Sequence, residues 1–509
     1  AVPLLWIIPL ALYVGTFIIV FARSYRLPMN KLLTTHAVLL VLAIASFAYP
    51  YIPSKIILIP LHFLLFFISA LVCHQALADA RPPAARLTEF YLIMSLGGVM
   101  GGILNALIAP VAFVFPIEYA LALGAVCFVR YAGRQKNLKD SIITELHTNW
   151  WILGAVVVFG LMTLALPESK GFLIFCIAVI ALLMLAYSNK RFTFALSACV
   201  MLTLYPGFNW LSKEKLVFAD RNFFGVSRIY DTASNQMRFY LHGVTMHGAQ
   251  MLTDKYRLTP ISYYNEKASV GDIFRMLDRR GGKQNVAVLG LGIGTLDCYR
   301  HKGRHFDMFE IDPDVQRIAE DRNLFTFLSD CNSPYDIILG DGRLQIEKMP
   351  DRHYDAIVLD AFSSDNIPIH IITKEAFQIY LKKLKPGGII IANISNNFLD
   401  LTPPLDSLAR DLDMTAIFKL SLAERVGDTN INYAPSIFSV LAPDAKNLKP
   451  LLSIPGWRPY DGDHHPRVWT DNYASMIRAF WPKGKPEVCK EGEVAYRCNA
   501  QNRKNKTPH

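Results

Sequence analysis

A glycine-rich segment follows one of the apolar runs in the second half of the chain. Residues 290–295 read Gly-Leu-Gly-Ile-Gly-Thr, directly after the apolar run 286–289. Gly290, Gly292 and Gly294 would allow the backbone to approach a ligand closely where a strand turns into a helix. Taken alone, this pattern is compatible with binding of NAD, FAD or S-adenosylmethionine.

Acidic side chains end the next three apolar runs. Glu310 lies 20 residues after Gly290, where a carboxylate can accept both hydroxyls of a ribose. Asp341, followed by Gly342, would lie at the rim where an adenine amino group would be bound, and Asp360 would lie over the same crevice. A helix N-cap is the simpler interpretation for any one of these acids. Three in succession favour a shared nucleotide site.

The apolar runs that carry these acids alternate with helical stretches. This alternation predicts a parallel, doubly wound sheet. Its expected strands are 286–289, 306–309, 336–339, 356–359 and 389–392, completed by 415–420 and 436–442. Shorter runs at 217–218, 226–230 and 237–241 are separated by turn residues, and they predict a small antiparallel sheet ahead of the glycine segment.

Charge divides the chain into two parts. Residues 1–210 carry only 13 Lys or Arg and 6 Asp or Glu, whereas residues 211–509 carry 39 and 36. The first part is therefore too apolar for an ordinary soluble domain, and the second is too charged for a membrane bundle. Because most of the positive excess lies in short loops between apolar runs, it indicates membrane topology and not nucleic-acid binding.

Eight apolar runs in the first part are long enough, or nearly so, to cross a bilayer. They cover 3–22, 37–53, 56–78, 90–112, 116–132, 150–167, 171–187 and 192–210. Odd-numbered loops between them hold 11 Lys or Arg and even-numbered loops hold 2, which places the odd loops in the cytoplasm. If all eight runs span, the second part emerges outside; if 192–210, broken by Pro206, lies along the interface, it is cytoplasmic.

The second part, residues 216–480, resembles the spermidine synthase (aminopropyltransferase) family, especially its membrane-fused branch. The resemblance rests on the glycine loop and on the acids that end the later strands. It implies that Glu310 binds the ribose, that Asp341 and Gly342 bind the adenine, and that Asp360 is the catalytic acid.

A further match to the family is the segment 469–473, Trp-Thr-Asp-Asn-Tyr. The resemblance implies a polytopic α-helical membrane domain followed by an α/β Rossmann-like domain of the class I methyltransferase type, with a small N-terminal antiparallel β-sheet. The expected parts are a bundle of seven or eight helices at 1–211, the β subdomain at 212–270, the Rossmann-like domain at 271–482 and a polar basic tail at 483–509.

The half of the site that would hold the amine departs from the family. Soluble members carry an Asp in the glycine loop where this chain has Ile293, and they hold the diamine with carboxylates where this chain has 242–250, His-Gly-Val-Thr-Met-His-Gly-Ala-Gln. A diammonium substrate requires several carboxylates, since buried charges need partners. Four residues are the candidates for substrate binding: His247, Gln250, Tyr264 and Asp365.

The leading hypothesis is a membrane-anchored aminopropyltransferase that uses decarboxylated S-adenosylmethionine and a small amine acceptor, with Asp360 as the base. Two alternatives are an S-adenosylmethionine-dependent methyltransferase and a catalytically silent nucleotide-binding subunit of a membrane complex. The expected partners are the lipid bilayer and a second copy or another membrane protein. The histidine pairs 242/247 and 464/465 lack zinc-like spacing, so no metal is expected.

The compartment of the second part has arguments on both sides. Sulfonium donors are made in the cytoplasm, which favours an integral protein of the plasma membrane with a cytoplasmic catalytic part. Cys489 and Cys498 in the polar tail could form a disulfide in an oxidising compartment, which would argue against the cytoplasm. Cys298 and Cys331 show no spacing that predicts a zinc site. We expect the cytoplasmic placement.

Overall fold

The computed structural model divides the chain into two compact units. One comprises Leu4–Lys215 with Asp220–Val226, and the other comprises Leu216–Ala219 and Ser227–His509 with Ala1–Pro3. The structure describes residues 5–22, 27–48, 55–129, 138–165, 169–211, 215–232, 236–243, 245–331, 333–361, 368–396, 399–422, 426 and 434–479.

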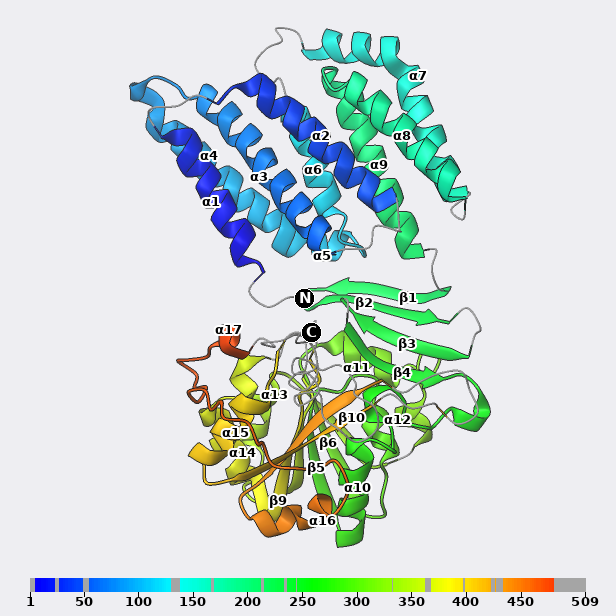
Figure 1. The fold of residues 1–509 in the computed structure, drawn as a ribbon, viewed down its shortest axis with the longest axis vertical. Helices are drawn as coiled ribbons and strands as arrows, with labels where there is room; N and C mark the ends of the chain where they lie inside the picture. Colours follow the sequence, from blue (N-terminus) through cyan, green and yellow to red (C-terminus); the bar gives the residue numbers. More distant parts are fainter. Residues whose placement is uncertain are drawn as a thin grey trace, which may run out of the picture. The chain divides into compact units, whose positions relative to one another are not determined.

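The first unit is helical, and each of the eight predicted apolar runs contains a helix (Figure 1). The helices are α1 (Ile7–Phe21), α2 (Met29–Ala48), α3 (Lys55–Asp79), α4 (Leu87–Ile103) continuing to α5 (Ala109–Ala112), α6 (Glu118–Val129), α7 (Leu138–Ala165), α8 (Lys170–Ala186) and α9 (Arg191–Leu211). By length and composition, four are able to cross a membrane: Met29–Ala48, Ile57–Asp79, Ala84–Ala112 and Ile143–Ala165. The other apolar helices are shorter.

Helix α9 is largely buried among its neighbours in the helical unit. It packs against α2, α6 and α7, and Phe194, Ala198 and Met201 on it are fully buried in the core that these helices share. Its first turn is held by Glu145 of α7, whose carboxylate accepts the backbone N–H groups of Phe192 and Thr193 at 2.9 Å each. The helix continues across Pro206, where the sequence suggested a break.

A small four-stranded sheet precedes the larger one. Its strands are β1 (Lys215–Asn222), β2 (Gly225–Asp231), β3 (Met237–His242) and β4 (Thr245–Met251), in the order β1-β2-β3-β4. The pairs β2–β3 and β3–β4 are antiparallel. The sequence predicted the first three strands only.

The predicted sheet is present, with seven strands in the described residues in the order β10-β11-β9-β8-β5-β6-β7, but it is parallel only in part. The strands are β5 (Gln284–Leu289), β6 (Arg304–Glu310), β7 (Tyr335–Leu339), β8 (Tyr354–Leu359), β9 (Leu384–Asn393), β10 (Thr415–Ser421) and β11 (Ser436–Ala442). Strands β5 to β9 pair in parallel, whereas β11 runs antiparallel to both of its neighbours. This is the mixed sheet of a Rossmann-like fold.

Helices cover both faces of this sheet (Figure 1). Successive residues of a strand point to opposite faces; thus Val286 and Val288 of β5 join one core cluster, with α10 (Ser269–Arg280) and α11 (Pro313–Glu320). Ala287 and Leu289 join the other. That second face carries α14 (Lys374–Lys383) and α15 (Thr402–Asp411), and shorter helices are α12 (Phe327–Asp330), α13 (Gly342–Lys348), α16 (Lys449–Leu452) and α17 (Met476–Ala479).

A disulfide joins Cys298 to Cys331, 33 residues apart, with 4.9 Å between the two Cα atoms. Cys298 ends the turn that follows the glycine loop, and Cys331 directly follows α12. The sequence did not predict this pair, because a long separation carries no local signal. Cys489 and Cys498, for which a pairing was considered, lie outside the described residues.

Candidate functional site

The glycine loop leaves the carboxyl end of β5 and requires its glycines. Gly290, Gly292 and Gly294 all have positive φ angles, of 106°, 56° and 77°. A Cβ atom at Gly290 would also lie 2.5 Å from the carbonyl oxygen of Asp360. The loop leads into a short 3₁₀ turn, Thr295–Cys298, and not into the α-helix that the sequence suggested. Gly290 and Gly292 are partly exposed, so a ligand would meet bare backbone there, whereas Gly294 is buried against Leu328.

Glu310 ends β6 beside this loop and binds backbone N–H groups with both carboxylate oxygens. One oxygen accepts Leu291 N–H at 3.1 Å, and the other accepts the N–H groups of Ile311 at 2.8 Å and Asp312 at 3.0 Å. Burial raises the pKa of Glu310, and the three backbone donors oppose that rise. Since each oxygen has two lone pairs, Oε2 keeps capacity for a ligand hydroxyl.

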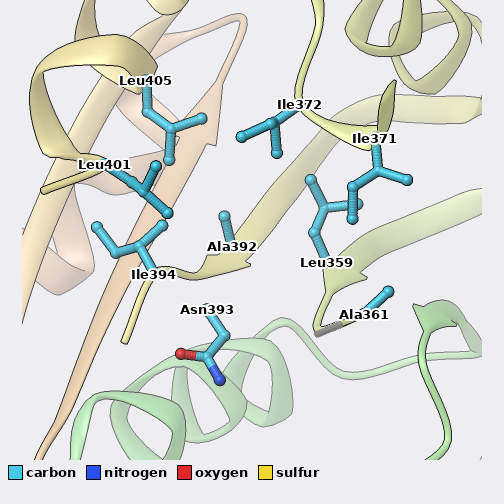
Figure 2. A pocket seen from close by; sticks show the side chains of 9 residues that line it. All are labelled: Leu359, Ala361, Ile371, Ile372, Ala392, Asn393, Ile394, Leu401 and Leu405. Carbon is cyan, nitrogen blue, oxygen red and sulfur yellow. The ribbon is translucent and has the colours of Figure 1, made fainter. Parts of the chain in front are cut away.

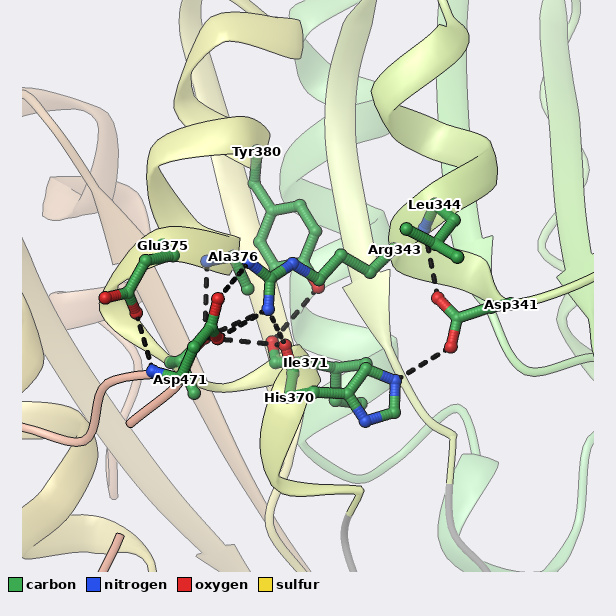
Figure 3. Close-up of polar contacts among 10 residues, drawn as sticks. Asp341, Arg343, Leu344, His370, Ile371, Glu375, Ala376, Tyr380 and Asp471 are labelled. Atoms are coloured by element: carbon green, nitrogen blue, oxygen red, sulfur yellow. Dashed lines mark hydrogen bonds and ion pairs between the residues drawn. The ribbon is translucent and has the colours of Figure 1, made fainter. Parts of the chain in front are cut away.

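Asp341, the predicted adenine ligand, ends β7 and also caps a helix. Its Oδ1 accepts Leu344 N–H at 3.0 Å at the start of α13, as the simpler interpretation predicted. Its Oδ2 lies 2.9 Å from Nε2 of His370 (Figure 3). Gly342 lies against Leu289, 3.0 Å from where a Cβ atom would be. The carboxylate is therefore oriented from two sides.

Arg343 connects this region to the C-terminal segment (Figure 3). Its guanidinium forms a two-pronged ion pair with Asp471, at 2.7 and 2.8 Å, and donates to the carbonyl oxygen of His370 at 2.9 Å. Asp471 also accepts the hydroxyl of Thr373 at 2.8 Å. The hydrogen bond from Arg343 lowers the pKa of Asp471, and the hydrogen bond from Thr373 lowers it further. Asp471 belongs to the segment 469–473 that the sequence singled out without assigning it a role.

Asp360 follows β8 at the carboxyl edge of the sheet and is 8% exposed. Burial raises its pKa to about 7, opposed by a hydrogen bond from Asn393. That bond, from Nδ2 to Oδ1, is 2.6 Å long. The orientation of the amide is fixed, because Oδ1 of Asn393 accepts Ser395 N–H at 3.0 Å. The sequence analysis did not single out Asn393, which directly follows the predicted strand 389–392.

The four candidates for substrate binding have different surroundings. Gln250 uses its amide within the protein, donating to Thr326 Oγ1 at 2.9 Å and accepting Thr326 N–H at 3.1 Å. Tyr264 is buried in the core. His247 lies on β4 near His242, with 5.7 Å between the ring centroids. Asp365 lies outside the described residues.

Tyr263, the neighbour of Tyr264, lies near Asp360. Burial raises the pKa of the Tyr263 phenol, and the negative charge of Asp360 raises it further. Its hydroxyl donates to the carbonyl oxygen of His247 at 3.4 Å. The ring is half-buried, whereas that of Tyr264 is fully buried. Of the two tyrosines that the sequence placed together, Tyr263 is therefore the one that is partly exposed.

A small apolar pocket lies between the carboxyl ends of β8 and β9 and the start of α15 (Figure 2). Its lining residues are Leu359, Ala361, Ile371, Ile372, Ala392, Asn393, Ile394, Leu401 and Leu405. Asn393, at the edge of the pocket, is the polar member of this set. In the described part of the chain, the grouping with spacing suited to a metal is His305, Asp307 and Asp336, near the amino ends of β6 and β7 and away from this edge.

Comparisons with known proteins bear on the second unit. No family model matches the chain. It is 32% identical over 115 residues to a polyamine aminopropyltransferase of Vibrio vulnificus, covering 22% of this chain and 37% of the relative. It is 23% identical over 206 residues to putrescine N-methyltransferase 2 of Nicotiana attenuata, covering 39% and 51%. The chain thus spans at most about half the length of these relatives.

A solved structure, a probable spermidine synthase from Corynebacterium glutamicum, is 14% identical with a TM-score of 0.36, covering 48% of this chain and 90% of that one. The sequence match to the aminopropyltransferase supports the resemblance that the motifs indicated.

Proposed function

Since the chain carries a spermidine synthase-like unit, we propose that it transfers an aminopropyl group from decarboxylated S-adenosylmethionine to an amine. The observation that carries this proposal is Asp360, a buried carboxyl group with a pKa raised to about 7 at the carboxyl edge of the sheet. A base with a pKa near the working pH is well matched to proton transfer.

The reaction would be an in-line displacement. The amine nitrogen attacks the carbon next to the sulfonium; the new C–N bond forms as the C–S bond breaks, and methylthioadenosine leaves. Only a neutral amine has a lone pair, yet the acceptor, with a pKa near 10.4 as for lysine, arrives mostly protonated. Asp360 would attract this cation and take its proton. Asn393 holds Oδ1 of Asp360, which leaves Oδ2 for the amine.

The adenosine part of the donor would lie along the neighbouring strand ends. Glu310 would accept the ribose hydroxyls beside the glycine loop of Gly290, Gly292 and Gly294, and Asp341 with Gly342 would bind the adenine. Charge-assisted hydrogen bonds of this kind contribute about 1.5–3 kcal/mol each. Positioning of the donor then supplies much of the rate enhancement.

The acceptor half departs from what a diamine would need, because His247 stands where a carboxylate would be expected. His247, Gln250, Tyr264 and Asp365 remain our candidates for contact with the acceptor, and Tyr263 joins them. The apolar helices support anchoring of the enzyme in a lipid bilayer.

Methyl transfer from S-adenosylmethionine is the second candidate. Ile293 in the glycine loop is 1% exposed and packs against Gly248, so no carboxylate there would hold the ammonium of an aminopropyl group. One of the relatives is named for N-methyl transfer to putrescine. On this alternative, Asp360 would deprotonate the methyl acceptor.

The test uses the purified full-length chain in detergent. It is incubated with decarboxylated S-adenosylmethionine or with S-adenosylmethionine, and with a panel of amines that includes putrescine and amines with longer alkyl chains. The proposal expects an aminopropyl mass increment that is absent in Asp360→Asn. A methyl increment from S-adenosylmethionine would favour the second candidate, and no increment with either donor would contradict both.

A further inference from the structure

The position of α9 bears on which side of a membrane the second unit occupies. A helix that lies along an interface exposes one face to water, but α9 is surrounded by α2, α6 and α7. Its residues Phe194, Ala195 and Ala198 are at most 1% exposed. Glu145 of α7 further fixes its first turn. This burial favours a crossing helix over an interfacial one, and the inference takes all eight apolar runs as crossings, beyond the four helices that are long enough by themselves.

The Lys and Arg residues in the loops indicate which way the eight proposed crossings run. The odd-numbered loops hold 11 Lys or Arg and the even-numbered loops hold 2, so the odd loops face the cytoplasm. The connection after α9 is the eighth in this numbering. It leads directly into the second unit, which would then begin on the outer side.

The disulfide is a second, independent indication. Cys298 and Cys331 lie in the second unit, and disulfides form and persist outside the cytoplasm but are rare within it. Joining the two thiols releases two protons and two electrons to an oxidant, and disulfide oxidases of the outer compartment supply that acceptor. Cys331 is 3% exposed, so the bond is packed inside the unit.

We infer that the nucleotide-binding unit lies on the extracytoplasmic side of the membrane, with the Cys298–Cys331 disulfide as a native link behind its glycine loop. This inference rests on the proposed membrane anchoring and is opposite to the cytoplasmic placement that we expected from the sequence. That expectation depended on where sulfonium donors are made. The structure adds two observations, the burial of α9 among α2, α6 and α7 and the disulfide.

The inference places the reaction in a sequence of steps. An adenosyl sulfonium donor made in the cytoplasm is charged and does not cross a bilayer unaided. A transport step that carries the donor outward must therefore precede transfer, and the acceptor must be an amine available outside the cytoplasm or at the outer membrane surface.

The test labels the full-length chain in intact cells with a membrane-impermeant maleimide. Cys489 and Cys498 are first replaced by Ser, and a single cysteine is then added. Asp254→Cys reports on the second unit, because the side chain of Asp254 is 98% exposed. Arg81→Cys is the matched control in the third loop, where the residue is also exposed. Lysed cells show that both sites can react, and the parent chain without an added cysteine gives the background.

We expect labelling of Asp254→Cys but not of Arg81→Cys in intact cells. We also expect that alkylation after acid quenching of cells leaves Cys298 and Cys331 unmodified until a reductant is added. Labelling of Arg81→Cys alone would overturn the inference, as would free thiols at Cys298 and Cys331. Labelling of both or neither would contradict the count of eight crossings. The labelling does not depend on catalysis, so failure of the transfer assay would affect the proposed function only.

Discussion

At the scale of single residues, the proposal depends on the ionisation of Asp360. Asp360→Asn keeps the volume of the side chain but removes its charge and basicity, and loss of a general base typically costs about 10²–10⁴ in rate. The adenosine contacts lie on other strands. We therefore expect Asp360→Asn to bind methylthioadenosine within a few-fold of wild type by calorimetry, while transfer falls below about 1%. Near-normal turnover in the variant would exclude Asp360 as the base.

Asn393 should act on the rate through Asp360. Its hydrogen bond opposes the effect of burial on the Asp360 pKa, which is about 7. Asn393→Leu removes this bond, so the pKa of Asp360 should rise. Because the base works only when deprotonated, the acidic limb of the pH–rate profile should move to higher pH, with turnover partly recovered in alkaline buffer. An unshifted limb with uniformly lower activity would indicate a packing role instead.

At the scale of elements, Arg343 and Asp471 join α13 to the C-terminal segment beside the predicted adenine ligand. Because this ion pair holds the segment that contains His370 and Thr373, Asp471→Asn should raise KM for the donor by several-fold, with a smaller effect on kcat. The double exchange Arg343→Asp with Asp471→Arg should recover part of the donor affinity that either single reversal loses. Equal loss in the single and double variants would show that the ion pair is not what positions the adenine site.

The disulfide acts on a second element, the glycine loop. It joins the turn after Gly294 to the residue after α12, and thereby limits movement of the loop backbone. Reduction, or replacement of Cys298 and Cys331 by Ser, should weaken methylthioadenosine binding without changing the pH at which transfer is half-maximal. Calorimetry with and without reductant measures this, and the serine variant, which should not respond to reductant, is the control.

Sequence patterns predicted the elements better than the contacts between them. All seven strands of the large sheet follow from apolar runs, and three acids follow from the strand ends. Strand β4 was missed because Thr245–Met251, with His247, Gly248 and Gln250, lacks regular apolar alternation. Asp360 and Asn393 are 33 residues apart in the sequence, as are Cys298 and Cys331. These side chains meet only in the folded chain, so no local pattern predicts their contacts.

At the scale of the whole molecule, the inferred topology determines which substrate pool the enzyme can use. A positively charged sulfonium donor added outside sealed vesicles reaches only sites on their outer surface. In right-side-out vesicles the nucleotide-binding unit would face the added donor, so transfer should proceed at nearly the rate seen after detergent. In inverted vesicles it would be enclosed, and transfer should be low until detergent opens them. Vesicles that contain Asp360→Asn give the background. Latency in right-side-out vesicles with full activity in inverted ones would place the catalytic unit in the cytoplasm, where the donor is made.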